Sequence, residues 1–292
     1  MRWLVTGATG TLGSYLVHEL AMSERTVQGW SGATAVDIDG IAVKPVDLTD
    51  ADAVTRAFRA ARPDVVVHAG SLARISDCLR SPDRARQINV EGTQVLATLS
   101  AKRGARLVYV STDLVFDGQA APYREDSPTQ PLSVYGRTKA DAESIVHSLS
   151  NSAVVRISLL FGPMRNQRPG LFDWLAEALR ASQPITLFAD EWRTPLGLLP
   201  AARALHALGR SDFTGTIHLG GPERMSRLEM GQRLARFLGV ADTALIAGQR
   251  DSEPGAEPRP QDVSLDSTLW RSRFPQIRLP DFESALTDML NQ

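Results

Sequence analysis

The sequence predicts an α/β protein in which helices cover both faces of a doubly wound, mostly parallel sheet. Two observations carry this prediction. Short apolar runs typical of buried strands alternate with longer segments of helical periodicity along most of the chain. A glycine-rich turn, VTGATGTLG at 5–13, joins the first apolar run to the first helical segment. Because each helix must return the chain to the same sheet, we expect the strands to run parallel.

The first half of the chain is expected to supply most of the sheet. Strands are predicted at RWLVT (2–6), TVQGW (26–30), IAVKPV (41–46), DVVVHA (64–69), RLVYVST (106–112) and AVVRISLLFG (153–162). Helices are predicted from Thr11, over DADAVTRAFRAA (50–61), in a long stretch from Pro82, and around YGRTK (135–139). The third of these begins with Ser81 followed by Pro82, which is a typical helix start.

The pattern changes after Gly162. A polar stretch at 163–170 precedes a predicted helix at 171–180 with Trp174 in the core, a strand near 185–188, a helix at 199–209 and a strand at 215–221. The segment GQRDSEPGAEPRPQ (248–261) is expected to be a surface loop. The chain therefore divides into residues 1–160, which contain the glycine-rich turn, and a smaller α/β region, residues 161–292; the two can interleave.

Composition narrows the class of partner. The 32 basic and 33 acidic residues nearly cancel, so the chain has no net field to attract nucleic acid or an anionic membrane surface. The single cysteine, Cys78, cannot form an internal disulfide, and the five histidines lack ligand-like spacing. We expect a cytoplasmic protein that binds small molecules and holds no metal, with neither a signal segment nor a membrane span.

The glycine-rich turn predicts a Rossmann-like, NAD(P)-binding first region. Gly7, Gly10 and Gly13 allow a tight turn, close backbone approach to a pyrophosphate and close packing of helix on strand. A carboxylate at the end of the second strand usually holds the ribose of NAD, and near Trp30 and Ser31 there is none. The missing carboxylate removes repulsion of a 2′-phosphate, so NADP(H) is favoured, with NAD(H) as the alternative. Ser31 could donate to that phosphate or be a plain loop residue.

Thr112, Tyr135 and Lys139 form the candidate catalytic set. Tyr135 and Lys139 are four residues apart, so on a helix they share a face, and the ammonium can lower the pKa of the phenol. Thr112 lies at the carboxyl end of a strand, where open parallel sheets present residues to ligands. With a carbonyl substrate, hydride would add to carbon while Tyr135 protonates oxygen and Lys139 stabilises the phenolate. An exposed polar pair is the alternative.

Six successive motifs give the chain a wider resemblance. VTGATGTLG, PDVVVHAGS, INVEGT, VSTDLVFDG, PYREDSPTQPLSVYGRTKADAE and VRISLLFG follow one another as in the extended short-chain dehydrogenase/reductase family. The run from Ser111 to Glu143 most resembles the dTDP-4-dehydrorhamnose reductase branch, which also contains the regulatory β subunit of methionine adenosyltransferase. The match is specific up to about residue 162 and looser beyond it.

The resemblance implies roles for particular residues. It makes Thr112, Tyr135 and Lys139 the catalytic set and residues 161–292 the substrate-binding region. With Ser31 added from the argument above, the cofactor-binding candidates are Gly7, Thr9, Gly10, Thr11, Leu12, Gly13, Ser31, Asp47, Leu48, Ala69, Gly70, Ser71, Tyr135 and Lys139. The substrate-side candidates are Asp113, Leu114, Asn89, Leu159, Arg193 and Arg259. The two arginines could fork onto a diphosphate or be solvated surface charges, and Asn89 could instead bridge backbone groups.

Leu114 and Leu159 depart from the pattern of the branch. Reductases of this branch usually have tyrosine and tryptophan there, beside the sugar, so the usual deoxysugar substrate is in question. Leu114 also stands where sugar-nucleotide dehydratases of the wider family have glutamate. Without that carboxylate the acid/base pair for water elimination is incomplete, and dehydration is not expected.

These observations together predict an NADP(H)-dependent reductase of a keto group on a nucleotide-activated deoxysugar. One alternative is a sugar-nucleotide epimerase of the same family, which would return the hydride. The other is a non-catalytic, NADP-binding regulatory subunit, for which Leu114 and Leu159 argue. A homodimer is compatible with the sequence, which does not determine the sugar, its stereochemistry, the pathway or the oligomeric state.

Overall fold

The computed structural model describes residues 1–165, 170–252 and 257–291. Within these ranges the main sheet has eight strands, and neighbouring strands are parallel except for β3 against β4. In spatial order they are β12 (Gly215–Leu219), β7 (Ser152–Ile157), β6 (Arg106–Thr112), β5 (Val65–His68), β1 (Arg2–Thr6), β2 (Thr26–Ser31), β4 (Ile41–Pro45) and β3 (Val36–Ile38). The predicted doubly wound parallel sheet is confirmed.

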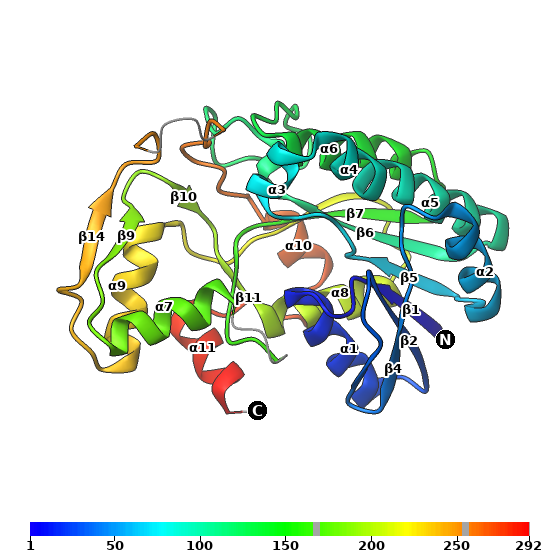
Figure 1. Cartoon of the computed structure of the whole chain (residues 1–292), viewed down its shortest axis with the longest axis horizontal. Coiled ribbons are helices and arrows are strands. Elements are labelled where there is room, and N and C mark those ends of the chain that lie inside the picture. The colour runs from blue at the N-terminus through cyan, green and yellow to red at the C-terminus, as the bar shows by residue number, and fades with distance from the viewer. Residues whose placement is uncertain (166–169, 253–256, 292) are drawn as a thin grey trace.

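Helices cover both faces of this sheet (Figure 1). One face carries α1 (Thr11–Ser23) and α8 (Leu198–Arg210), and the other carries α2 (Ala51–Ala61), α3 (Ile75–Arg80), α4 (Pro82–Arg86), α5 (Gly92–Arg103) and α6 (Val134–His147). The long helix predicted from Pro82 is present as a continuous helical run of α4, a π-helical turn η1 (Gln87–Glu91) and α5. Helix α3 was not predicted. A short 3₁₀ turn, η2 (Asp113–Val115), follows β6.

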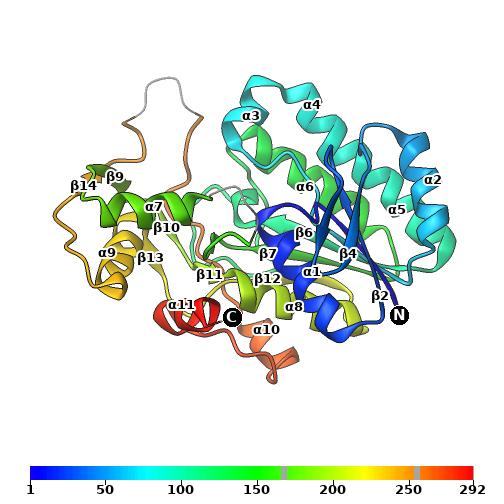
Figure 2. The same ribbon diagram turned by 60° about the horizontal axis from the view of Figure 1, so that its bottom comes forward.

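A second group of elements lies beside the main sheet (Figures 1 and 2). It is built from α7 (Leu171–Arg180), β9 (Ile185–Phe188), α9 (Arg227–Leu238) and β14 (Leu245–Gly248), with the short pairs β10 (Trp192–Arg193) with β13 (Met225–Ser226) and β8 (Leu160–Phe161) with β11 (Leu196–Gly197). The helices α10 (Thr268–Arg273) and α11 (Phe282–Leu290) complete the chain. The predicted loop at 248–261 is described except for residues 253–256, which lie outside the described ranges. Residues 166–169 of the polar stretch also lie outside them.

Two elements from the second half of the chain, α8 and β12, pack against the main sheet and its helices, so the two halves interleave. β12 pairs with β7 at the edge of the main sheet, and α8 packs on α1. Gly209 of α8 lies so close to β1 that a Cβ there would stand 2.5 Å from the Trp3 ring. Trp174, expected in the core, is 48% exposed on α7, and that expectation was wrong. The reason is that helical periodicity locates a face but does not identify what covers it. Across the described residues, no helix is both long enough and apolar enough to cross a membrane.

A charged cluster joins α8 to α1. His206 of α8 lies 3.6 Å from Glu19 and 3.1 Å from Glu24, and Arg210 donates to the same Glu24 carboxylate at 2.5 Å. Hydrogen bonding to Glu19 raises the pKa of His206, burial opposes this, and Glu24 adds to the rise. The protonated imidazole is therefore the form that holds the two helices together.

Replacing His206 with glutamine should lower stability in a pH-dependent way. Because the folded-state pKa lies above the unfolded value, the stabilisation is fully present below about pH 6.5 and is lost as pH rises through the folded pKa. At pH 6 we expect the substitution to lower the free energy of unfolding by about 1 kcal/mol, a value discounted for solvent screening. The loss should be smaller at pH 8.5. Urea unfolding at both pH values measures it. Arg210→Gln is the control, whose cost should be alike at both; a His206→Gln cost independent of pH would contradict the prediction.

Candidate active site

A cleft of about 800 Å³ opens at the carboxyl ends of the parallel strands, where the chain leaves the neighbouring strands β1 and β5 toward helices on opposite faces of the sheet. Every residue predicted to bind the cofactor lines it, together with Thr112 and Leu159. The turn after β1 fits a pyrophosphate backbone cradle. Gly7 has a φ of 68°, and a Cβ there would lie 2.7 Å from the Cα of Gly70, while a Cβ on Gly13 would lie 2.1 Å from the Gly7 carbonyl oxygen. Only glycine leaves this turn open.

The lining of the cleft also includes two basic residues that sequence reasoning missed. Arg74 and Arg84 line it, and both are exposed. Arg84 is close enough to Asp47 to help lower the pKa of that carboxyl, after the larger effect of hydrogen bonds from Thr49. Ser31 lies at the cleft as predicted, but its hydroxyl exchanges hydrogen bonds with the backbone of Thr34. No local pattern could have found Arg84, because α4 reaches the cleft through the fold.

The candidate catalytic residues meet at the end of β6 and the start of α6. Ser133 caps α6 by accepting a hydrogen bond from the Gly136 N–H at 3.0 Å, which places Tyr135 in the first turn. Lys139, one turn later, is buried and donates through Nζ to the Val110 carbonyl at 2.6 Å. Thr112 ends β6 and lines the same cleft as both of them.

Burial is the main influence on the pKa values of Tyr135 and Lys139. Desolvation raises the pKa of the Tyr135 phenol, with Asp113 the next contributor. Desolvation also lowers the pKa of Lys139 to about 7, although Glu143 opposes it. The expectation that Lys139 lowers the pKa of Tyr135 is therefore wrong for the ligand-free protein. The physical reason is that the ammonium is itself desolvated and turns toward the Val110 carbonyl.

A buried carboxylate fastens α6 to the sheet behind this set. Glu143 accepts a hydrogen bond from Ser111 of β6 at 2.5 Å and pairs with Arg156 of β7 at 2.8 Å. The side chains of Glu143 and Arg156 are 4% and 6% exposed, so the pair is shielded from solvent. Lys139 packs within 4.1 Å of the Tyr109 ring on the same side. The helix cannot shift along the strands without breaking this pair.

A second pocket of about 490 Å³ continues from the cleft, since Arg74, Thr112, Ser158 and Leu159 are among the residues that line both. Its wall includes the substrate-side candidates Asp113, Leu114, Leu159, Arg193 and Arg259. Glu191, Arg227 and Glu257 also line it and were not anticipated. The lining of this pocket therefore includes both aliphatic and densely charged residues.

Arg193 connects the two carboxylates of the charged wall. Its Nε lies 3.5 Å from Asp113 and its Nη2 lies 3.1 Å from Glu191. Ser158 donates to Asp113 at 3.0 Å. Burial raises the pKa of Asp113, and the Arg193 guanidinium opposes that rise. Burial would also raise the pKa of Glu191, but Arg227 and Arg193 outweigh it and hold the pKa below its usual value.

Asn89 lies outside both pockets. Its side chain is buried in η1, where it accepts from the Leu72 N–H at 2.8 Å and donates to the Leu72 carbonyl at 3.1 Å. It also donates to the Thr138 hydroxyl of α6 at 2.9 Å. The amide thus ties the loop after β5 to the catalytic helix, which matches the bridging role among its two predicted roles.

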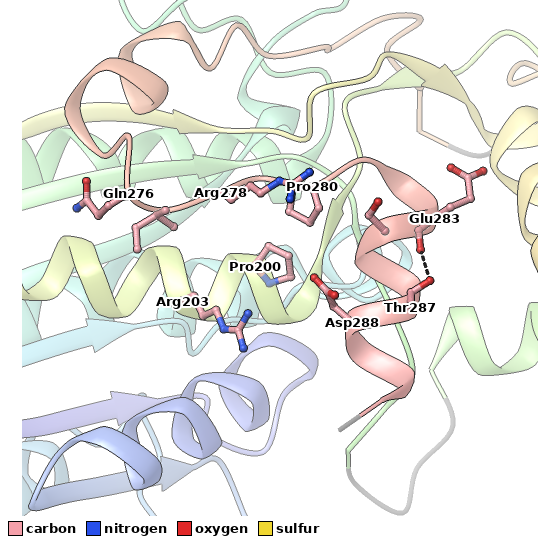
Figure 3. Close-up of a pocket in the computed structure, with 10 residues that line it drawn as sticks. Pro200, Arg203, Gln276, Arg278, Pro280, Glu283, Thr287 and Asp288 are labelled. Carbon is pink, nitrogen blue, oxygen red and sulfur yellow. Dashed lines mark hydrogen bonds between the residues drawn. The ribbon is translucent and has the colours of Figure 1, made fainter.

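A separate pocket of about 560 Å³ lies between α8, the segment 276–280 and α11 (Figure 3). None of the candidate site residues lines it. Two of its charged side chains already have partners, since Arg203 faces Glu19 at 3.7 Å and Glu283 pairs with Arg233. We therefore take the cleft at the carboxyl ends of the strands, and not this pocket, as the candidate active site.

Comparison with known proteins agrees with this architecture. Methionine adenosyltransferase 2 subunit beta of Xenopus tropicalis is 31% identical over 273 residues, which cover 91% of this chain and 80% of the relative. A probable dTDP-4,6-dihydroxy-2-methyloxan-3-one 4-ketoreductase of Streptomyces antibioticus is 32% identical over 295 residues, covering 99% and 94%. The structure of dTDP-4-dehydrorhamnose reductase from Bacillus anthracis in complex with NADP superposes with a TM-score of 0.88. At 23% identity over 99% of this chain and 98% of that one, it shows the shared fold.

The family model described as RmlD substrate binding domain matches residues 1–292. The motifs in the first half predicted this branch, and the match extends over the looser second half as well. The chain belongs to the RmlD substrate binding domain family, the dTDP-4-dehydrorhamnose reductase-like branch of the extended short-chain dehydrogenases/reductases.

Proposed function

We propose that this chain is an NADP(H)-dependent reductase of a keto group on a nucleotide-activated deoxysugar. The observation that carries the proposal is the convergence of Thr112, Tyr135 and Lys139 on one cleft that continues into a charged pocket. The glycine cradle fits a dinucleotide pyrophosphate, and the second pocket has room for a sugar. The ketoreductase relative from Streptomyces antibioticus supports the same reaction class.

The residues of the chain divide the chemistry as follows. A bound nicotinamide would supply the hydride. Tyr135, whose pKa is raised by desolvation, keeps its proton at neutral pH and can donate it to the carbonyl oxygen. Thr112 offers a hydroxyl to the same oxygen, and Lys139, when protonated, stabilises the phenolate left behind. Glu143 holds α6 in register with β6 throughout.

Two alternatives stay open. An epimerase would use the same Tyr135 without net consumption of NADPH. A non-catalytic NADP-binding subunit is favoured by the adenosyltransferase relative and by Leu114 and Leu159, which remove the hydroxyl and indole that the branch usually presents to the sugar. Stoichiometric oxidation of NADPH distinguishes the reductase from both.

Replacing Tyr135 with phenylalanine should abolish reduction while leaving cofactor binding intact. Loss of the proton donor should lower kcat at least about 100-fold. Cofactor binding should be retained, because the phenyl ring keeps the packing. The measurement is NADPH oxidation with a 4-keto-6-deoxy sugar nucleotide, beside NADPH titration of both proteins. Equal turnover by the variant would remove Tyr135 as the donor. Tight NADPH binding without turnover by the native protein would favour the regulatory subunit.

Lys139→Met should stabilise the ligand-free protein more at low pH than at high pH. The pKa of Lys139 is about 7 in the folded protein, against 10.5 for a lysine in water. The neutral Lys139 side chain therefore costs no stability above the unfolded pKa. The free energy of unfolding falls as pH is lowered from that value to the folded pKa of about 7. We expect the effect of the substitution on unfolding free energy to differ by about 3 kcal/mol between pH 6 and pH 9.5. Lys102→Met, on the exposed face of α5, is the matched control, and an equal effect of Lys139→Met at both pH values would contradict the prediction.

Arg84→Gln should weaken the preference for NADPH over NADH. The exposed guanidinium lines the cleft near Asp47, where the family resemblance places the adenine of the cofactor and where a 2′-phosphate would add negative charge. We expect KM for NADPH to rise about tenfold, with KM for NADH little changed. Arg86→Gln, on the same helix but paired with Glu91 and Asp141, serves as the control. Equal changes in both KM values would show that Arg84 does not read the phosphate.

A further inference from the structure

His68 and His218 are buried histidines of the main sheet that take no part in the chemistry proposed above. His68 ends β5, and His218 belongs to β12. Burial lowers the pKa of both imidazoles to about 3, and Lys139 adds to the effect at His68 as Arg156 does at His218. Both rings are therefore neutral at physiological pH. A neutral imidazole has one N–H donor and one bare nitrogen acceptor, and its partners decide which nitrogen has the proton.

The partners of His68 place its proton on Nε2. Thr93 of α5 donates its only hydroxyl proton to the Asn89 carbonyl at 2.6 Å, so it accepts from His68 Nε2, which lies 3.0 Å away. On the other side of the ring, Nδ1 lies 2.6 Å from the hydroxyl of Thr6, which pairs with His68 in register on β1. Nδ1 therefore accepts the Thr6 proton, and the Thr6 oxygen accepts from the Gly70 N–H at 3.1 Å.

The opposite tautomer of His68 would leave polar groups without partners. A proton on Nδ1 would point at the Thr6 oxygen, and within the described residues the Thr6 hydroxyl proton would then have no acceptor. Thr93 would have to release the Asn89 carbonyl in order to donate to Nε2. Because buried polar groups without partners are costly, the tautomer with the proton on Nε2 is the one that the fold selects.

These hydrogen bonds form one chain from the backbone of Gly70 to the start of α5. Its Gly70 end lies in the wall of the cleft, beside the glycine turn. Gly70 and Gly7 are in close contact there, because a Cβ on Gly7 would stand 2.7 Å from the Gly70 Cα. His68 lies outside the lining of the cleft, so it acts on this wall only through Thr6.

We propose that His68, neutral and with its proton on Nε2, is a positioning residue that holds the backbone of Gly70 against Gly7. The proposal rests on the cofactor-binding part of the proposed function, because that function places a pyrophosphate on this turn. Every hydrogen bond of the chain has the same direction, so each one polarises the next. The contact between the two glycines then passes any shift of the Gly70 backbone directly to the turn.

Nitrogen NMR of the protein with ¹⁵N-labelled histidine tests the tautomer. His68 should show a protonated Nε2 and a bare Nδ1 throughout the range from pH 5.5 to pH 8.5, and its signals should be absent from His68→Asn. His218 supplies the contrast, because its Nδ1 lies 3.1 Å from the Tyr123 carbonyl, which can only accept, and its proton is therefore on Nδ1. A proton on Nδ1 of His68, or a charged ring in this range, would overturn the inference.

Titration of NADP⁺ into the ligand-free protein by calorimetry tests the positioning role. His68→Gln can reach Thr93 with an N–H but offers Thr6 no acceptor, so Kd should rise about tenfold. His68→Asn places an amide oxygen near the position of Nδ1, where it can accept from Thr6, so Kd should return to within about twofold of the native value. Both variants should lower the melting temperature, because each leaves one end of the chain without its partner.

His218→Gln is the matched control, because it also replaces a buried histidine of the sheet and lies outside the lining of both pockets. It should lower the melting temperature and leave Kd unchanged. The inference is overturned if His68→Gln binds NADP⁺ as the native protein does, or if His68→Gln and His68→Asn lose affinity equally. The expected order of Kd values, in a protein that reduces no nucleotide sugar, would support the positioning role and refute the proposed function. Absence of NADP⁺ binding by the native protein would refute both.

Discussion

The buried carboxylate of Glu143 is the contact on which the candidate active site depends. It accepts from Ser111 of β6 and pairs with Arg156 of β7, while it belongs to α6. Ser111 precedes Thr112 in the chain, and Glu143 follows Lys139 by one helical turn. One ionised side chain therefore sets the register between the helix and both strands. Breaking a buried pair of this kind costs about 3–5 kcal/mol, so this contact holds the candidate catalytic residues firmly in place.

Two buried carboxylates act on the catalytic pair from different sides. Glu143 favours the charged form of Lys139 and opposes its desolvation. Asp113 disfavours the phenolate of Tyr135 and adds to its desolvation. The arrangement therefore keeps the proton on the phenol until a reaction demands it, which suits a donor to a carbonyl. Because Arg193 links Asp113 to Glu191, the electrostatics of the phenol are joined physically to the charged wall of the second pocket.

The fold could be predicted from the sequence where local pattern and local structure coincide. The glycine turn, the apolar strands and the Tyr135–Lys139 spacing each depend on residues close in the chain. Three features depend on long-range packing, for which no local signal exists. They are the pairing of β12 with β7, the arrival of Arg84 at the cleft and the contact of Arg227 with Glu191. The pKa of Tyr135 was missed for the same reason, because desolvation is a property of the folded surroundings.

The cost of burying Lys139 bears on whether the chain catalyses a reaction or only binds. Holding the pKa of Lys139 at about 7 destabilises the fold at neutral pH, because an unfolded lysine keeps its proton up to about pH 10, and a methionine of similar length carries no such cost. Leu114 and Leu159 line the second pocket, and Leu159 also lines the cleft. The departures from the branch thus line the second pocket, where the proposed function places the sugar, while Thr112, Tyr135 and Lys139 are unchanged. This distribution favours a reductase with a different sugar over a protein that has lost its reaction.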